Sequence, residues 1–370
     1  MRIGEAGSGE QVFIPKRVGR VPVRWDPAAL RDAEQPVIFF SNGIGDSLLT
    51  LPTMRALLEM FPGRLTLICP PEASLLCYSC LPFRRVVTLP IVTRKMDGDS
   101  VVRRDPRFFD AQLAAAEVGS CDVFLSVVPW HSECLQELVS RLIPHTTIGL
   151  FPFYDVCIGM RPAKHASDMA FELAKALQPS VRIDDFAAPP KLSAEVRERA
   201  AMLRANLPGD AGVLVVHPDT AAEKCWRPEC YRWLFDAFLD RWPRFFIFVV
   251  GMFYEKLDTG RHSDRIISCM GLPLDFSVAL LSRADVFLGV NSSMLHAADL
   301  FRVPGVGLFE PGQTERWGFR FGPHRHLEGK ASPADIEENA VLCALEELIE
   351  EGSGIRVPKA RNLYREVTLD

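Results

Sequence analysis

Three kinds of sequence signal are missing from this chain of 370 residues. It has no run of about 18 apolar residues that would cross a membrane, and its first residues, MRIGEAGSGE, contain no apolar signal core. Its ten cysteines include one lone CxxC pair, Cys77 and Cys80, with no second pair at the spacing of zinc ligands. We therefore expect reduced thiols, no metal site and a cytoplasmic protein.

Two nucleotide-binding motifs are missing as well. Neither the GxGxxG of dinucleotide-binding enzymes nor the GxxxxGK[ST] of P-loop enzymes occurs in the sequence. The net charge of −5 and the sequence pI of about 6.0 give no sign of a nucleic-acid partner. These features disfavour nicotinamide enzymes, P-loop enzymes and nucleic-acid binders, and no cofactor is expected.

Short apolar runs alternate with amphipathic helical segments in both halves of the chain. The runs are VIFF at 37, RLTLIC at 64, RVVTLP at 85, DVFLSVV at 122 and TTIGLF at 146, then GVLVVHP at 212, RFFIFVVG at 244, RIISCMG at 265, DVFLGV at 285 and VPGVGLF at 303. Continuous apolar strands separated by helices are typical of parallel sheets that are covered on both faces. The length exceeds that of a usual single core, so we predict an α/β protein with two Rossmann-like domains.

The composition suggests four segments. Residues 1–35 form an extension in which QVFIPKRVGRVPVRWDP alternates apolar residues with Gly and Pro, which suggests a β-hairpin. Residues 36–185 form the first domain and residues 186–352 the second, with the turn-rich RIDDFAAPPK as the link between them. Residues 353–370 form a tail.

The stretch SNGIGDSLLTLP, residues 41–52, follows the first strand of the first domain. Gly43 and Gly45 indicate either a close approach of the backbone to a ligand or a positive φ. Asp46 falls in the first turn of the next helix, where the helix dipole favours a carboxylate. Asp46 is therefore either a helix cap beside two turn glycines or part of a ligand site.

Two loops of the second domain carry groups that attract anions. Lys224 follows the strand GVLVVHP, where its ammonium group would face a phosphate, although a lone lysine there is more often a surface residue. Asn291, Ser292 and Ser293 open a helix and would supply a cap and backbone N–H groups. His296, one turn further, would donate to a phosphate or satisfy a core carbonyl. Together the two loops predict a diphosphate-bearing ligand.

Several segments together resemble glycosyltransferase family 9, whose best-known members are ADP-heptose:lipopolysaccharide heptosyltransferases. The segments, which occur in family order between residue 37 and about residue 320, are NGIGDSLLTLP, HPDTAAEKCWRPECYRWL, VVGMFYEK, GVNSSMLHAADLFRVPGVGLFEP and TERWGF. The resemblance implies a GT-B fold with two facing Rossmann-like domains, the donor nucleotide on the C-terminal domain and the acceptor largely on the N-terminal one. It also implies inverting, metal-independent transfer of a sugar.

The resemblance also implies roles for individual residues. Asp46 matches the proposed general base, and Gly43 and Gly45 would let the backbone approach the sugar and diphosphate. Lys224 matches the lysine that contacts the donor phosphate, with Thr220 in the loop before it.

Other matches lie further along the second domain. The helix start that holds the diphosphate corresponds to Ser292, Ser293 and His296. Glu255 matches an acid near the nucleoside, and Gly251, which ends the strand before it, is assigned to the nucleoside site as well. Asn291 stands where the family has Asp, and Ser293 where it has Gly, so donor affinity or sugar choice is expected to differ.

The expected chemistry suits these residue types. Inverting transfer needs one base, and a lysine with helix N–H groups can stabilise the leaving diphosphate where other glycosyltransferases use a metal. The resemblance implies heptose carried on ADP as the donor. The acceptor stays open among a saccharide, the lipopolysaccharide core, a protein and a small molecule, with at most peripheral membrane contact.

Two other functions remain open from the residues. A non-catalytic nucleotide-sugar-binding protein would keep the donor loops and lose Asp46, which is present here. A GT-B epimerase acting on a nucleotide sugar would have no separate acceptor and would need further acids near the donor.

Overall fold

The computed structural model describes residues 26–95, 102–161, 163–252 and 258–352. The chain divides into two compact units, Met1–Lys191 and Leu192–Asp370. Residues 186–191, which the sequence assigned to the second domain, therefore lie in the first unit. The expected β-hairpin over residues 1–25 and the tail over residues 353–370 lie outside the described residues.

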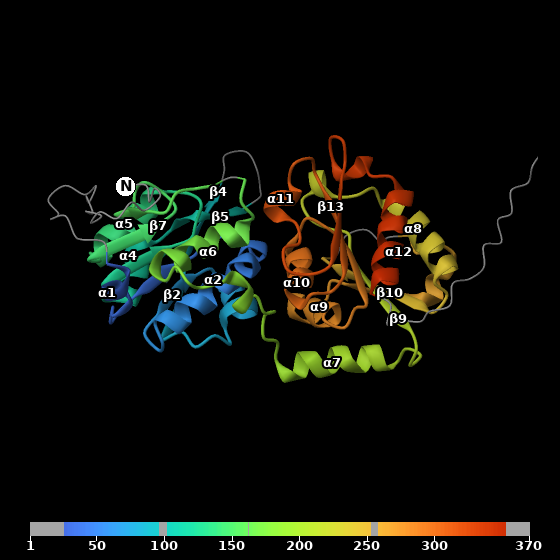
Figure 1. The fold of residues 1–370 in the computed structure, drawn as a ribbon, viewed down its shortest axis with the longest axis horizontal. Helices are drawn as coiled ribbons and strands as arrows, with labels where there is room; N and C mark the ends of the chain where they lie inside the picture. The colour runs from blue at the N-terminus through green and yellow to red at the C-terminus, as the bar shows by residue number, and fades with distance from the viewer. Residues whose placement is uncertain (1–25, 96–101, 162, 253–257, 353–370) are drawn as a thin grey trace, which may run out of the picture. The chain divides into compact units, whose positions relative to one another are not determined.

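The first unit is built on a parallel six-stranded sheet with the strand order β3-β2-β1-β6-β7-β8 (Figure 1, blue to green). Its strands are β1 (Val37–Phe39), β2 (Thr66–Cys69), β3 (Arg85–Thr88), β6 (Val123–Ser126), β7 (Thr146–Gly149) and β8 (Val156–Cys157). An antiparallel pair, β4 (Ile91–Lys95) and β5 (Val102–Phe109), is inserted between β3 and β6.

Helices cover both faces of the first sheet. They are α1 (Pro27–Arg31), α2 (Ile44–Met60), α3 (Pro71–Ala73), the π-helical turn η1 (Ser74–Tyr78), α4 (Ala111–Val118), α5 (Glu133–Leu142), α6 (Ala166–Leu177) and the 3₁₀ turn η2 (Ile183–Asp185). Helix α2 packs beside α6, and α4 packs beside α5. Val37 and Phe39 of β1 join the core under α4 and α5, whereas Ile38 between them is buried outside that cluster. Alternate side chains of one strand thus serve opposite faces.

The end of the first unit is tied to helix α2 by Arg55. Its guanidinium donates to the carbonyl oxygens of Phe186 (3.1 Å), Ala188 and Pro189 (2.7 Å). Burial lowers the pKa of Arg55 from its ordinary value. This contact explains why the segment that reads as a linker belongs to the first unit.

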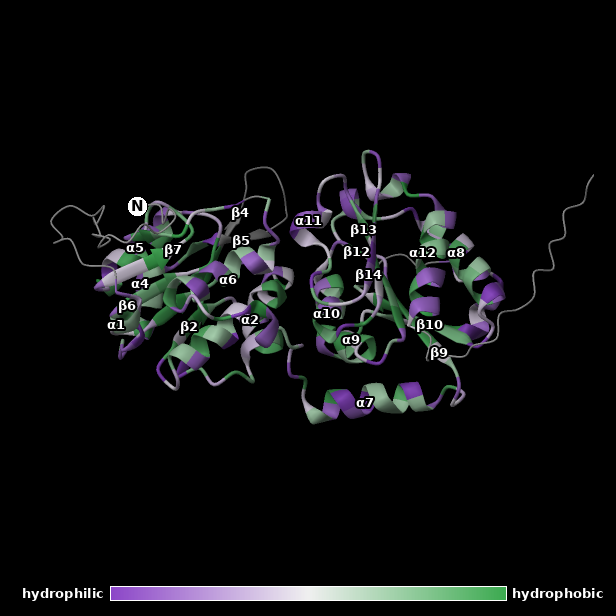
Figure 2. Cartoon of the chain, viewed as in Figure 1, coloured by the Kyte–Doolittle hydropathy of each residue, from purple (hydrophilic) through white to green (hydrophobic). Residues whose placement is uncertain are grey.

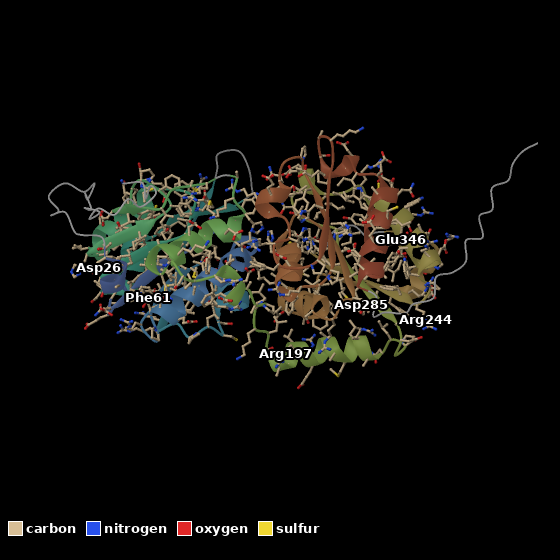
Figure 3. The ribbon with its side chains drawn as sticks, in the orientation of Figure 1. Asp26, Phe61, Arg197, Arg244, Asp285 and Glu346 are labelled. Atoms are coloured by element: carbon tan, nitrogen blue, oxygen red, sulfur yellow. The ribbon has the colours of Figure 1, made fainter. Side chains whose placement is uncertain are left out.

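The second unit repeats the same sheet with the strand order β11-β10-β9-β12-β13-β14, again all parallel (Figure 1). Its strands are β9 (Gly212–His217), β10 (Phe245–Gly251), β11 (Ile266–Met270), β12 (Val286–Val290), β13 (Gly305–Phe309) and β14 (His324–Glu328). Asp285, labelled in Figure 3, accepts a 2.7 Å hydrogen bond from the Val213 N–H and joins the starts of β12 and β9. In Figure 2 the central strands are coloured largely as hydrophobic, as expected for a sheet covered on both faces.

The helices of the second unit also form two layers. They are α7 (Ala194–Ala205), η3 (Ala222–Lys224), α8 (Pro228–Arg241), η4 (Gly260–Arg265), α9 (Leu274–Leu281), α10 (Ser293–Phe301), α11 (Thr314–Trp317), η5 (Pro333–Asp335) and α12 (Glu338–Glu351). Helices α8 and α12 share one core cluster and are joined by a 2.9 Å ion pair between Arg241 and Glu346. Helix α9 packs beside α7 and α10.

All ten strands expected from the apolar runs are present, and the predicted pair of parallel-sheet α/β units is confirmed. Four further strands, β4, β5, β8 and β14, were not expected. The ten cysteines are free thiols. No helix in the described part of the chain is both long and apolar enough to cross a membrane.

Candidate functional site

Each unit has one point where the chain switches direction across its sheet. In the first unit β1 continues to β2 and β3 on one side, and β6 pairs with β1 on the other. In the second unit β9 plays the part of β1, and β12 that of β6. Open α/β sheets bind ligands beyond the carboxyl ends of the strands at such points. Most of the predicted site residues that the structure describes follow one of these strands.

The loop after β9 holds Lys224 at the end of the 3₁₀ turn η3. Trp226 anchors this loop, because its buried indole donates a 2.9 Å hydrogen bond to the carbonyl oxygen of Ile336. The Lys224 Nζ atom lies 4.0 Å from Glu310 Oε2, and both side chains are partly exposed. Thr220, half-buried at the start of the loop, accepts from the thiol of Cys225 through its carbonyl oxygen.

Glu310 directly follows β13, so its contact with Lys224 spans the end of β12, which lies between β9 and β13 in the sheet. Helix α10 begins there, immediately after β12, with Asn291 and Ser292 before it and Ser293 as its first residue. Lys224 and the start of α10 therefore both lie at the carboxyl end of the strands of one sheet. Both would attract an anion there.

Ser292 occupies the N-cap position of α10 but does not cap the helix. Its backbone is extended, and its side chain makes no hydrogen bond to the backbone N–H groups of the first turn. The Oγ atom instead lies 3.1 Å from Nδ1 of His217, the last residue of β9. His296, one turn into the helix, is only 4% exposed, which favours its contact within the core over direct contact with a ligand.

His217 continues this chain of contacts to Asp219. Its Nε2 atom lies 3.0 Å from Asp219 Oδ1, and Asp219 Oδ2 accepts a 2.7 Å hydrogen bond from the backbone N–H of Met252. His217 and Asp219 are 7% and 9% exposed. A serine–histidine–aspartate relay, with the histidine and aspartate buried and the serine half-buried, thus links the ends of β9, β10 and β12.

Gly251, assigned to the nucleoside site from the sequence, has a further role in this relay. A Cβ atom at this position would lie 2.6 Å from Asp219 Oδ2, and its φ of +154° is rare for other residues. A glycine here is therefore required by the packing of Asp219. Glu255, the other residue assigned to the nucleoside, lies outside the described residues.

In the first unit the loop after β1 is shorter than the sequence suggested. Helix α2 begins at Ile44, so only residues 40–43 join it to β1, and Gly45 is the second residue of the helix. Gly43 is its N-cap with φ −68°, so the alternative of a positive φ is wrong for this residue. A Cβ atom at Gly43 would meet nothing within 4 Å. Neither its φ nor its packing requires glycine there, and the approach of a ligand to Gly43 stays a prediction.

Asp46 is the third residue of α2 and is half-buried. It lies in the first turn, as predicted, where the helix dipole stabilises a carboxylate. The loop before Asp46 is held by a residue that follows β6. The indole N–H of Trp130 donates to Asn42 Oδ1 at 2.7 Å. This bond joins the two loops at the switch point of the first sheet.

A metal site is not evident in the part of the chain that the structure describes, where no group of three His, Cys, Asp or Glu side chains could hold an ion. The sequence contains one Asp-x-Asp triplet, at Asp97 and Asp99, which lies outside the described residues. The expectation that no metal takes part stays a prediction.

Four residues of these loops were not expected from the sequence: Asn42, Trp130, His217 and Asp219. His217 and Asp219 stand in HPDT at the end of the strand GVLVVH, which is the signal that could have revealed them. Their partner Ser292 is 75 residues from His217, so only the pairing of β9 with β12 brings the two together.

No profile of a known protein family matches the sequence, and no curated protein matches it. Solved structures do match. A glycosyl transferase family 9 protein from Veillonella parvula is 17% identical with a TM-score of 0.70, and the match covers 88% of this chain and all of that one.

Two E. coli proteins are similar over comparable lengths. ADP-heptose lipopolysaccharide heptosyltransferase II is 14% identical with a TM-score of 0.63, covering 86% of this chain and 99% of its own. A heptosyltransferase solved with ADP is 17% identical with a TM-score of 0.59, covering 86% of this chain and 100% of its own. The chain therefore has the GT-B fold of the glycosyl transferase family 9 heptosyltransferases, with two parallel-sheet α/β units.

Proposed function

We propose that the protein is an inverting, metal-independent glycosyltransferase that moves heptose from ADP-heptose to an acceptor hydroxyl. One observation carries the proposal: Lys224 and the first turn of α10 both lie beyond the carboxyl ends of the strands of the second sheet, in the loops after β9 and β12. A cation and a helix N-terminus are suited to a diphosphate. Fold neighbours solved with ADP or an ADP-heptose analogue support the choice of donor.

In this proposal Asp46 takes the proton of the acceptor hydroxyl. An acid in the first turn of a helix, beside a glycine whose missing side chain leaves open space, suits close approach of a sugar. As the bond between the sugar and the diphosphate breaks, negative charge builds on the leaving group. Lys224 and the α10 N–H groups would stabilise that charge more strongly than the ground state.

The first test is ligand binding. A thermal-shift screen across ADP, UDP, GDP and their sugars should single out adenosine diphosphate compounds, because a ligand at 100 times its Kd adds about 2.7 kcal/mol of stability. Lys224→Ala should weaken the shift, whereas the matched surface variant Lys191→Ala should not. No shift with any nucleotide contradicts the proposal.

Turnover then separates the alternatives. Release of ADP that depends on an added acceptor supports transfer, whereas conversion of the sugar without an acceptor supports the epimerase. Binding without either reaction supports the non-catalytic protein. EDTA should leave the rate unchanged, and a rate that vanishes with EDTA and returns with Mg²⁺ contradicts the metal-independent mechanism.

A further inference from the structure

The relay from Ser292 through His217 to Asp219 fixes where its protons lie. A carboxylate only accepts hydrogen bonds, so the His217 Nε2 atom, 3.0 Å from Asp219 Oδ1, carries the ring proton. When the ring is neutral, its Nδ1 atom is an acceptor, and the Ser292 hydroxyl, 3.1 Å away, donates to it.

In this arrangement the Ser292 hydroxyl cannot donate a hydrogen bond to an anionic ligand. A hydroxyl has one proton, and here that proton points inward to His217. The side of the oxygen that remains for a ligand presents lone pairs, which repel the oxygen atoms of a phosphate. Ser292 can donate to a phosphate only if Nδ1 stops accepting.

Uptake of one proton by His217 would reverse the relay. Nδ1–H would then donate to Ser292 Oγ, and the hydroxyl proton would be released toward the ligand. The imidazolium ring would lie between the Asp219 carboxylate and the bound anion, so both neighbours would stabilise its charge. The proton comes from solvent, and no covalent bond other than N–H is made.

We propose that His217 and Asp219 are positioning residues that couple binding of the donor diphosphate to uptake of one proton. This inference rests on the proposed function, because it places the diphosphate at the start of α10. It adds that the protein binds the donor more tightly when His217 carries the second ring proton.

The other charged groups around His217 do not offer the same coupling. On α8, Tyr231 is fully buried, and its pKa is raised well above the ordinary value, first by burial and then by the nearby thiol of Cys225 and carboxylate of Asp219. Lys224 faces Glu310. On α10, His296 is buried. On the other side, Met252, directly after β10, contributes its N–H, and β12 places Gly289 opposite His217.

The test is the number of protons taken up when ADP binds. Isothermal titration of the full chain with ADP, at one pH in HEPES and in Tris, gives this number from the dependence of the enthalpy on the buffer. The terminal phosphate of ADP contributes its own protons equally in every variant. The difference between the parent and a variant therefore isolates the relay.

Asp219→Asn is the sharpest variant. The amide oxygen can still accept from Met252, and the amide NH₂ can donate to His217 Nε2, which moves the ring proton to Nδ1. The Ser292 hydroxyl is then released without any proton uptake. We expect this variant to take up about one proton fewer than the parent when it binds ADP. Its Kd for ADP should therefore depend less on pH than that of the parent, by up to about tenfold per pH unit.

His217→Gln provides a second variant, because glutamine cannot titrate. On binding ADP it should take up about one proton fewer than the parent, and it should bind ADP more weakly than Asp219→Asn does. His262→Gln is the matched control, since His262 also contacts a carboxylate, Asp240 Oδ1 at 2.7 Å, but lies on η4. It should take up the same number of protons as the parent.

The outcomes are distinct. If the parent binds ADP and all four proteins take up equal numbers of protons, the coupling is wrong while the proposed function stands. If the parent binds neither ADP nor an ADP-sugar, the proposed function and the coupling both fail. Should His217→Gln not fold, the comparison of the parent with Asp219→Asn still decides.

Discussion

The indole of Trp130 holds Asn42, one residue before the N-cap of the helix that carries Asp46, through a 2.7 Å hydrogen bond. The two residues come from loops after neighbouring strands, β6 and β1. Asn42 thus links the loop before Asp46 to a side chain packed on the first core cluster. The position of Asp46 is expected to depend on this bond.

Trp130→Phe removes the donor but keeps an aromatic ring beside Phe39, with which Trp130 makes an edge contact. We expect the free energy of unfolding to fall by about 0.5–1.5 kcal/mol and turnover to fall with it. Denaturant unfolding and ADP release measure both effects. Trp233→Phe, at an exposed tryptophan of α8, is the control and should change neither.

Asp46→Asn keeps the shape of the side chain and removes its ability to accept a proton. Turnover should fall by about 10²–10⁴-fold, while binding of ADP is preserved. Glu59→Gln, an exposed carboxylate further along the same helix, should be unaffected. A variant that turns over within about threefold of the parent would show that Asp46 only stabilises the helix, since base catalysis contributes far more.

Lys224→Ala should reduce kcat/KM for the donor by roughly 10- to 150-fold, because a charge-assisted hydrogen bond contributes about 1.5–3 kcal/mol. The loss should exceed the loss of ground-state affinity, since charge on the leaving phosphate grows in the transition state. Lys224→Arg should recover only part of the rate. Kinetics with a saturating acceptor measure these effects, and an unchanged kcat/KM places the phosphate elsewhere.

Gly251→Ala tests the packing of Asp219. The added Cβ atom would lie 2.6 Å from the Asp219 carboxylate in a backbone conformation that alanine rarely adopts. We expect a loss of about 1–3 kcal/mol of stability and weaker ADP binding, because Asp219 must move away from Met252 and His217. Gly209→Ala, where a Cβ atom meets nothing within 4 Å, is the control. Equal stability of the two variants contradicts this role.

Asp285 predicts a pH dependence of stability. Burial raises its pKa above the ordinary value, and the hydrogen bond from the Val213 N–H opposes part of the shift. Between the ordinary and the raised pKa the folded state binds more protons than the unfolded state, so stability falls as the pH rises through that window. Carboxyls with a lowered pKa, such as Asp240 and Glu328, add the opposite slope to both proteins, so the measurement is the difference between the parent and Asp285→Asn in denaturant unfolding from pH 3 to pH 7. That difference should show the slope of Asp285, and equal slopes in the two proteins would contradict the assignment.

The strands with apolar residues on both faces could be predicted from the sequence, because burial of a parallel sheet leaves continuous apolar runs. The edge strand β14 could not, since HRHLE is polar and only partly buried. Asp46 was placed correctly in the first turn of α2, but Gly45, which reads as a turn residue, also lies in that turn.

Residues could be proposed for the candidate site only where they follow a strand in a recognisable loop, as Lys224, Asn291 and Ser292 do. Their roles stay predictions. The relay could not be predicted, because a hydrogen bond between His217 and Ser292 depends on which strands are neighbours in the sheet. The residues around His217 and Ser292 do not indicate the order of the strands in the sheet.

A serine that does not cap its helix has a thermodynamic consequence for the unliganded protein. A side-chain cap at the start of a helix contributes about 0.5–2 kcal/mol. By turning to His217, Ser292 gives up that contribution to α10. The first turn of α10 thus lacks the stabilisation that a side-chain cap from Ser292 would give, and a bound anion would supply it.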